Sequence, residues 1–355
     1  KEEYKPVPMG DGQQLALRLQ ASRFFETYSF SFAEPWLGGE QPVRFSTSIS
    51  QTTQYRYDFM TGLANKDQYF KIRGINFGLA KRLQVPDDYF TLSQTIGYQY
   101  FDLNNYYTGL FTFGNGVSNN LFYAVALSRN NTFTNPIFPV GGSSFTIGAK
   151  FSFPYSLVDN TDFGDLENQP AYQNADGSPN REKIDQEKFR WLEYYKLNFE
   201  GSWYTRIIDK FILRTHAEFG FLGAYSPEKG IIPFERYYLG GDGLAQVALD
   251  GREVVALRGY ENQSLSSRDG STVYNKFSLE LRYPITLKPS ASIFALSFLE
   301  AGNGFNNFRE FNPFNSKRSA GFGIRIFMPA FGLLGIDFGY GFDSALPNDL
   351  NPHGL

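Results

Sequence analysis

Long stretches of this chain alternate bulky apolar residues with small or polar ones, and this alternation limits the folds open to it. Residues 145–153 show it most clearly. The odd positions are apolar: Phe145, Ile147, Ala149, Phe151 and Phe153. The even positions are small, polar or charged: Thr146, Gly148, Lys150 and Ser152. In a β-strand the two sets face opposite sides of the sheet. Strands with one apolar and one polar face are typical of a barrel in lipid around a wet lumen.

The amino-acid composition further limits the classes of protein to which the chain can belong. Aromatic residues make up 18% of the 355 residues, with 37 Phe and 23 Tyr, which suits a lipid-facing wall with aromatic girdles. The net charge of −3 gives no basic surface for nucleic acid. Cysteine is absent, which excludes disulfides and thiolate metal sites. No segment has the ~20 consecutive apolar residues of a membrane-spanning helix. The opening residues 1–6 have no apolar core and do not resemble a signal peptide.

The alternation predicts about thirteen antiparallel strands, separated in turn by short and long connections. The predicted strands are 13–23, 28–36, 43–57, 69–82, 89–102, 121–130, 144–155, 194–206, 210–224, 273–284, 292–302, 319–328 and 333–342. Two long loops are expected, at 158–187 and 227–272. The first is polar and without periodicity, and we expect it to be solvated.

Several strands carry charges on the parity that should face the lumen. We expect these residues to point inward: Lys196, Glu200, Arg214, His216 and Glu218. Residues 293–300 are ambiguous, because both parities there are partly apolar. Periodicity alone therefore leaves open which face of that strand lies inside, although Glu300 can point inward.

The 227–272 loop is far longer than the ~12–15 residues usual for a connection without structure, which points to a function. It contains Leu257-Arg258-Gly259-Tyr260. Glycine lets the backbone bend sharply while the guanidinium reaches away. A solvated Arg-Gly turn is the simpler interpretation of these residues. The alternative is a loop folded into the lumen, with Glu280 and Glu300 on the next two strands as carboxylate partners.

The motifs together resemble those of BamA-type outer-membrane barrel-assembly proteins. The matching stretches are Tyr238-Leu239-Gly240-Gly241 with Arg258-Gly259-Tyr260, the acids Glu280 and Glu300, Arg318-Ser319-Ala320-Gly321-Phe322-Gly323 with Gly335-Ile336-Asp337-Phe338-Gly339, and residues 28–39. One position departs from the family pattern, since Glu300 stands where aspartate is usual. The resemblance spans the whole chain.

The resemblance implies a transmembrane antiparallel β-barrel in the outer membrane of Gram-negative bacteria. The family barrel has sixteen strands, so residues 1–355 are expected to form a partial barrel, with the first two strands and the last strand outside this sequence and no POTRA domains. The implied function is that of the central subunit of the machinery that inserts and folds barrel proteins by strand templating at a lateral seam. The implied partners are unfolded barrel proteins as clients, accessory lipoproteins or other subunits, and outer-membrane lipid.

Catalysis is not expected, and neither is a cofactor. With two His, at 216 and 353, and no Cys, zinc sites and His-based triads have few candidate residues. His216 is interpreted as a polar residue of the inner wall. Three alternatives remain: a related exporter of proteins or peptides, a passive porin-like channel, and a lumenal hydrolase. The hydrolase would require a positioned nucleophile, which the sequence does not identify.

Overall fold

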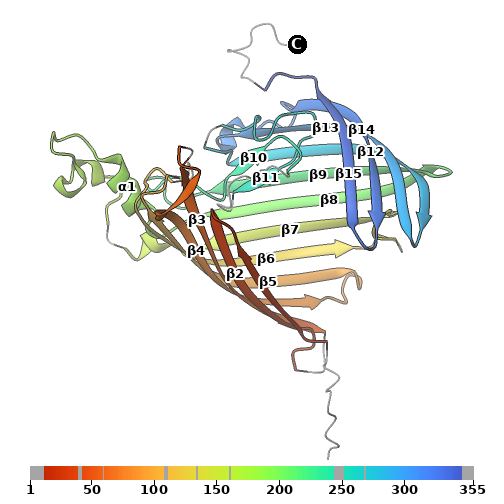
Figure 1. Cartoon of the computed structure of the whole chain (residues 1–355), viewed down its shortest axis with the longest axis horizontal. Helices are drawn as coiled ribbons and strands as arrows, with labels where there is room; N and C mark the ends of the chain where they lie inside the picture. The colour runs from red at the N-terminus through yellow and green to blue at the C-terminus, as the bar shows by residue number, and fades with distance from the viewer. Residues whose placement is uncertain are drawn as a thin grey trace, which may run out of the picture. The chain divides into compact units, whose positions relative to one another are not determined.

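The computed structural model describes residues 12–38, 42–58, 60–107, 111–132, 135–159, 161–243, 252–267 and 269–345. Within these ranges the fold is built almost entirely from β-strands, as Figure 1 shows. By its internal contacts the chain divides into two compact units, residues 1–126 with 150–193 and residues 127–149 with 194–355. No helix in the described part of the chain is both long and apolar enough to cross a membrane.

The first unit is a series of antiparallel strands, each hydrogen-bonded to the next along the chain. These strands are β1 (Gln14–Ala21), β2 (Phe25–Glu34), β3 (Val43–Asp58), β4 (Leu63–Arg82) and β5 (Phe90–Asn104). Two further strands, β6 (Gly116–Asn130) and β7 (Gly142–Ser152), contribute residues to both units.

The second unit continues the antiparallel pattern with six long strands. They are β8 (Tyr195–Ile208), β9 (Phe211–Gly223), β12 (Val273–Lys288), β13 (Ala291–Phe305), β14 (Lys317–Met328) and β15 (Gly332–Gly341). The described residues thus contain thirteen long strands, which confirms the predicted number. Their positions also agree, although β4 and β6 begin earlier than predicted, where few apolar residues mark the alternation.

The two faces of these strands differ as the alternation predicts. On β8, Leu197 and Trp203 are 41% and 62% exposed, while Lys196 and Ser202 on the other parity are buried. The exposed parity is apolar and the covered parity is polar, which is the reverse of a soluble sheet and matches a wall in lipid.

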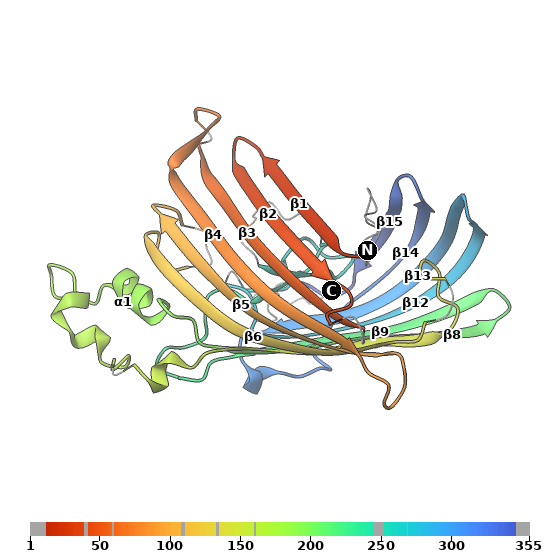
Figure 2. The same cartoon turned by 90° about the horizontal axis from the view of Figure 1, so that it is seen from below.

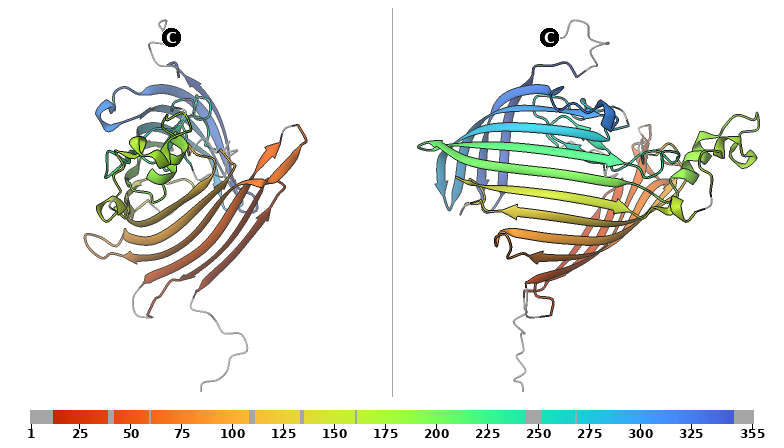
Figure 3. Two further views of the ribbon diagram at one scale, coloured as in Figure 1. Left: turned by 90° about the vertical axis from the view of Figure 1, so that its left-hand side faces the viewer. Right: turned by 180° about the vertical axis from the view of Figure 1, so that it is seen from behind.

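The segment at 158–187 was expected to be a long solvated loop, and its described residues contain local structure that this expectation did not include. It contains the 3-10 turns η2 (Leu166–Asn168) and η3 (Pro170–Tyr172) and the helix α1 (Arg181–Lys188), visible together in Figure 3. A third turn, η1 (Tyr155–Leu157), precedes it. Phe163, Leu166 and Ile184 form a small buried cluster with Tyr172 packed against it. A few apolar residues, widely spaced among polar ones, therefore form a core that periodicity could not reveal.

The 227–272 loop is also ordered where it is described. Two short strands within it, β10 (Tyr237–Leu239) and β11 (Glu253–Val255), pair in parallel. Tyr237 packs on the inward face of the wall, because a Cβ at Gly220 of β9 would lie 2.5 Å from its ring. Figure 2 shows this teal segment on the inner side of β9, β12 and β13. The expected loop folded into the lumen is therefore present.

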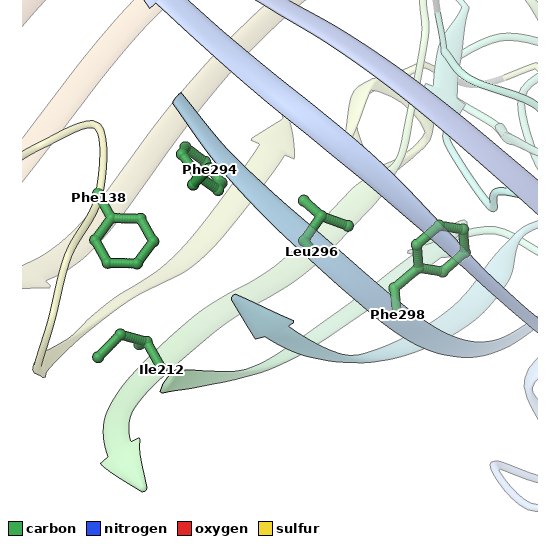
Figure 4. Close-up of a cluster of buried hydrophobic side chains, with 5 residues drawn as sticks. All are labelled: Phe138, Ile212, Phe294, Leu296 and Phe298. Carbon is green, nitrogen blue, oxygen red and sulfur yellow. The ribbon is translucent and has the colours of Figure 1, made fainter. Parts of the chain in front are cut away.

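The face of β13 that periodicity left open is now determined. Phe294, Leu296 and Phe298 are buried on the same parity as Glu300. They form a cluster with Phe138 and Ile212, drawn in Figure 4. Leu299, on the other parity, is 57% exposed. The inner wall therefore carries an apolar patch. The apolar residues of the inner parity are explained by packing, and those of the outer parity by a position facing lipid.

Candidate functional site: the Arg258 loop on the inner wall

Arg258 lies at the centre of a buried ion cluster between the loop and the wall. Its Nε and Nη2 donate to Glu300 Oε1 at 3.0 and 2.6 Å, and its backbone N–H donates to Glu300 Oε2 at 2.9 Å. Nη2 also donates to Glu280 Oε1 at 2.8 Å. The guanidinium stacks over the ring of Phe298, 3.7 Å from its centroid. The expected pairing of Arg258 with both carboxylates is therefore observed, and the solvated-turn interpretation is wrong.

Glu280 is shared by three arginines. Its second oxygen accepts from Nε and Nη2 of Arg282 at 2.8 and 2.5 Å, and Nη1 of Arg214 lies 3.6 Å from Oε1. The Glu280 side chain is only 4% exposed. A buried carboxylate of this kind depends on its cationic partners, since an unpaired charge in this environment is very unfavourable.

The cluster extends to the last described strand through Asp337. Nη1 of Arg258 donates to Asp337 Oδ2 at 3.3 Å, and Arg325 of β14 binds both Asp337 oxygens at 2.6 and 2.7 Å. Gly323 faces Asp337 across the strand pair, and a Cβ at Gly323 would lie 1.8 Å from Asp337 Oδ1. Gly321 similarly leaves room for the Phe298 ring, 2.4 Å from its ideal Cβ. Glycine at both positions makes space for the cluster.

Gly259 and Tyr260 bring the loop against the backbone of β14 and β15. Gly259 has φ +93°, and a Cβ there would lie 2.8 Å from the carbonyl carbon of Tyr340. The Tyr260 hydroxyl donates to the carbonyl of Arg318 at 2.7 Å and accepts from the N–H of Asp343 at 3.3 Å. The approach is so close that only glycine fits at position 259.

The Arg318 side chain lies at the edge of this contact rather than inside it. It binds Asp343 through Nη2 and Nε at 2.9 and 3.1 Å. Its side chain is 68% exposed. Arg318 therefore takes part in the site through its carbonyl and through Asp343, and not through the buried cluster.

The other loop residues singled out by the sequence shape the turn that presents Arg258. Gly240 and Gly241 have φ of +117° and +82°, and a Cβ at Gly240 would lie 2.4 Å from the carbonyl oxygen of Glu261. Leu257 is fully buried and forms a bridge with Gly241. Within the other stretch that matched the family, residues 28–39, Gly39 lies outside the described residues.

A second ion cluster holds the loop to β8, and the sequence did not identify it. Lys196 Nζ contacts Glu235 Oε2 at 3.1 Å and also binds Glu253, while the Tyr237 ring lies 4.6 Å away. The Tyr237 hydroxyl donates to Asn198 Oδ1 at 2.6 Å. The inward parity of Lys196 was predicted, but its partners lie within the loop and have no periodicity that could place them.

Electrostatics keep Arg258 charged in this setting. Burial alone would lower the pKa of Arg258, but the hydrogen bonds and negative charge of Glu300 and Glu280 raise the pKa above its ordinary value. The cluster contains four arginines (Arg214, Arg258, Arg282 and Arg325) and three acids (Glu280, Glu300 and Asp337). It is suited to fixing a loop to a wall. A cavity of about 1200 Å³ lies beside it, lined by Arg258, Glu261 and Glu280 among others.

The structure also brings together Ser202, His216 and Glu218, a set that the sequence did not suggest. Ser202 Oγ lies 2.8 Å from His216 Nδ1, and His216 Nε2 lies 2.6 Å from Glu218 Oε1. Arg214 Nη2, however, lies 3.1 Å from both Ser202 Oγ and His216 Nδ1. The Arg214 guanidinium therefore holds the serine hydroxyl, and Lys276 binds Glu218 at 3.1 Å. The arrangement is a hydrogen-bonded chain along the inner wall.

Comparisons with known proteins agree with this architecture. A model of the Omp85 superfamily domain matches residues 9–349. The crystal structure of BamA from Haemophilus ducreyi lacking POTRA domains 1-3 is similar, with a TM-score of 0.63 and 18% identity, over 94% of this chain and 62% of that chain. CdiB from Escherichia coli gives a TM-score of 0.49 and 13% identity, over 89% of this chain and 49% of that chain. No curated protein sequence matches. The fold is that of an outer-membrane β-barrel, and the chain spans less than two thirds of the length of these structures.

Proposed function

The chain belongs to the Omp85 superfamily of bacterial outer-membrane β-barrels, and from this we propose that it is the central subunit of a machine that inserts and folds other barrel proteins. Residues 1–355 would then be part of its barrel domain. Unfolded outer-membrane barrel proteins would be its clients, and accessory lipoproteins or other subunits its partners.

The proposed mechanism depends on the backbone of the barrel edge. A β-strand cannot enter lipid unless its N–H and C=O groups are hydrogen-bonded. A barrel whose seam opens offers unpaired backbone groups to an incoming strand, and strand addition satisfies the groups on both sides. No covalent step, nucleotide or cofactor is required, so we propose that the protein is not an enzyme.

The observation that supports this proposal best is the span of the Arg258 cluster. It joins side chains from five strands of the second unit, β9, β12, β13, β14 and β15, to one residue of the loop. A seam can open without unfolding the barrel only if the rest of the wall stays rigid. We propose that Arg258, Gly259, Tyr260, Glu280 and Glu300 provide that rigidity and perform no chemistry.

Depletion of the protein from cells tests the proposal. Unrelated outer-membrane barrels should then decline together, as measured by quantitative proteomics of the outer membrane. Complementation with Arg258→Ala should fail to restore them. Complementation with Arg181→Ala, which removes a 79% exposed arginine from the first unit, should restore them fully.

The alternatives give different results in the same experiment. Loss of one exported protein, with other barrels at normal levels, would indicate a related exporter. Normal barrel levels together with ion conductance of the purified protein would indicate a porin-like channel. Either result would contradict the proposed insertase.

A further inference from the structure

The segment 306–316, between β13 and β14, folds onto the outer side of the wall. It includes the 3-10 turn η4 (Phe308–Glu310). Phe308 and Phe311 pack on Phe221 of β9 with centroids 5.8 and 5.5 Å apart, and Phe311 also packs on Phe305 of β13 at 5.4 Å. Phe221 and Phe305 lie on the parity opposite to His216 and Glu300, so they face outward. In Figure 2 this blue turn lies on the opposite side of the strands from the teal 227–272 loop.

Two outward asparagines hold the segment in this position. Asn275 of β12 and Asn303 of β13 are paired in register. Asn275 Nδ2 donates to Ser316 Oγ at 3.0 Å, and Asn303 Nδ2 donates to the carbonyl of Asn315 at 2.8 Å. These amides would be unfavourable in hydrocarbon, so their row marks the upper edge of the apolar band.

The length of the apolar band on β12 agrees with this position of its upper edge. Below Asn275 the outward residues of β12 are apolar or aromatic as far as the register shift after Pro284 (Phe277, Leu279, Leu281 and Tyr283), and beyond it Ile285 and Leu287 are exposed and apolar. The paired stretch of β13, from Ala301 to Ser292, has nine steps of ~3.3 Å, which give about 30 Å along the strand or about 23 Å of height at the ~40° tilt of membrane barrels. That is close to the ~25 Å of the usual apolar band, so the 306–316 segment lies at the level of the lipid headgroups.

The side chains that the segment exposes suit this level. Phe308 and Phe314 are 70% and 94% exposed, although Phe308 also packs on Phe221 and Phe311. Arg309 is exposed next to Phe308, and within the described residues the structure gives it no ion pair. Aromatic residues form girdles at both interfaces of membrane barrels, and arginine can lay its apolar stem in the interface while its charge stays in water.

The wall below the segment can receive acyl chains. A groove of about 1410 Å³ is lined by the outward side chains of Trp203, Leu279 and Leu299 and also reaches Arg318. Its floor includes small residues, Gly201, Ala217 and Ala301. An apolar groove of this kind is complementary to the acyl chains of a lipid.

We propose that the 306–316 segment is a binding site for an anionic phospholipid. Phe308 inserts at the boundary between headgroup and acyl chain, Arg309 binds the headgroup phosphate, and the acyl chains lie along the groove below. This proposal depends on the position of the chain in the outer membrane and not on the insertase function.

Tryptophan fluorescence in vesicles tests the position of the segment. In the intact protein with every tryptophan changed to Phe, including Trp36, Trp191 and Trp203, Phe308→Trp supplies one reporter. Phosphatidylcholine brominated near the headgroup should quench it more strongly than phosphatidylcholine brominated near the chain ends. The control reporter Glu261→Trp, beside the lumenal cavity, should not be quenched by either. If neither brominated lipid quenched the reporter at position 308, as neither should quench the reporter at position 261, the proposal would be overturned.

The headgroup preference is tested with the same reporter. Brominated phosphatidylglycerol should quench Trp at position 308 more than brominated phosphatidylcholine, and excess inorganic phosphate should leave the ratio unchanged. Adding Arg309→Gln should lower this preference by up to about fivefold, which corresponds to the ~1 kcal/mol of one basic residue at an anionic surface. Arg181→Gln in the first unit is the matched control and should have no effect. A ratio of one in the parent protein, loss of the preference with phosphate, or an unchanged ratio in Arg309→Gln would contradict the proposal.

Discussion

Replacing Arg258 with alanine removes the residue on which the loop contact depends. The structure shows which of its carboxylate partners would be left without a cation. Glu280 would keep Arg282 and Arg214, and Asp337 would keep Arg325. Glu300 is different. Within the described residues, the other hydrogen bond that the structure gives its carboxylate is from the backbone N–H of residue 258.

The expected cost follows from the burial of Glu300. Its side chain is 3% exposed, so the variant would leave a carboxylate buried without a cation. Breaking a buried ion pair in this way costs ~3–5 kcal/mol of folding free energy. At ~2–4 °C per kcal/mol for a large domain, the melting temperature should fall by on the order of 10 °C. The double variant Arg258→Ala/Glu300→Gln should recover part of the loss, because the stranded charge is gone.

The heat-dependent gel mobility of the intact barrel, followed against temperature in detergent and in vesicles, measures this effect. Arg181→Ala serves as the control for loss of an exposed arginine. Arg258→Lys should be intermediate, because an ammonium keeps the charge but cannot bind two carboxylates as the guanidinium fork does. An unchanged melting temperature in Arg258→Ala, or a double variant less stable than the single one, would refute the reasoning.

Gly259→Ala should destabilise the barrel by several kcal/mol more than Gly332→Ala. Both glycines have positive φ, but only a Cβ at position 259 would contact backbone atoms. The melting temperature should therefore fall further in Gly259→Ala than in Gly332→Ala. Lys196→Gln should remove the buried ammonium that joins β8 to Glu235 and Glu253 of the loop. Limited proteolysis within 227–272 should therefore be faster, whereas Lys210→Gln in the exposed β8–β9 turn should have no such effect. Ser202 should not react with a fluorophosphonate, because Arg214 covers its hydroxyl; stoichiometric labelling detected by mass spectrometry would instead support a lumenal hydrolase.

The strands were predictable because burial in lipid on one side and in the lumen on the other imposes a strict period of two. The pairing of Arg258 with Glu280 and Glu300 was predicted from parity together with a family resemblance. The features that the sequence could not reveal depend on contacts between residues that are far apart in the chain. Arg282 and Arg325 have an inward parity that the pattern allowed, but only the folded wall shows that they share carboxylates with the loop.

The segments that departed from the predictions have a common physical cause. In 158–187, and in the parallel pair β10–β11, short elements are stabilised by a few buried residues and leave no periodic signal. The same applies to β13, where Phe294 and Phe298 face the lumen because Phe138 and the Arg258 guanidinium pack against them. Apolar residues on the inner face of a barrel strand cannot be distinguished by pattern from those on the outer face.

The most direct test of the account is reconstitution of the intact protein in vesicles, with the folding of an unrelated outer-membrane barrel measured by its protection from added protease. We expect the wild-type protein to accelerate this folding and Arg258→Ala, although it still inserts in the membrane, to lose most of the acceleration. A wild-type protein that conducts ions but leaves the client's folding rate unchanged would contradict the account.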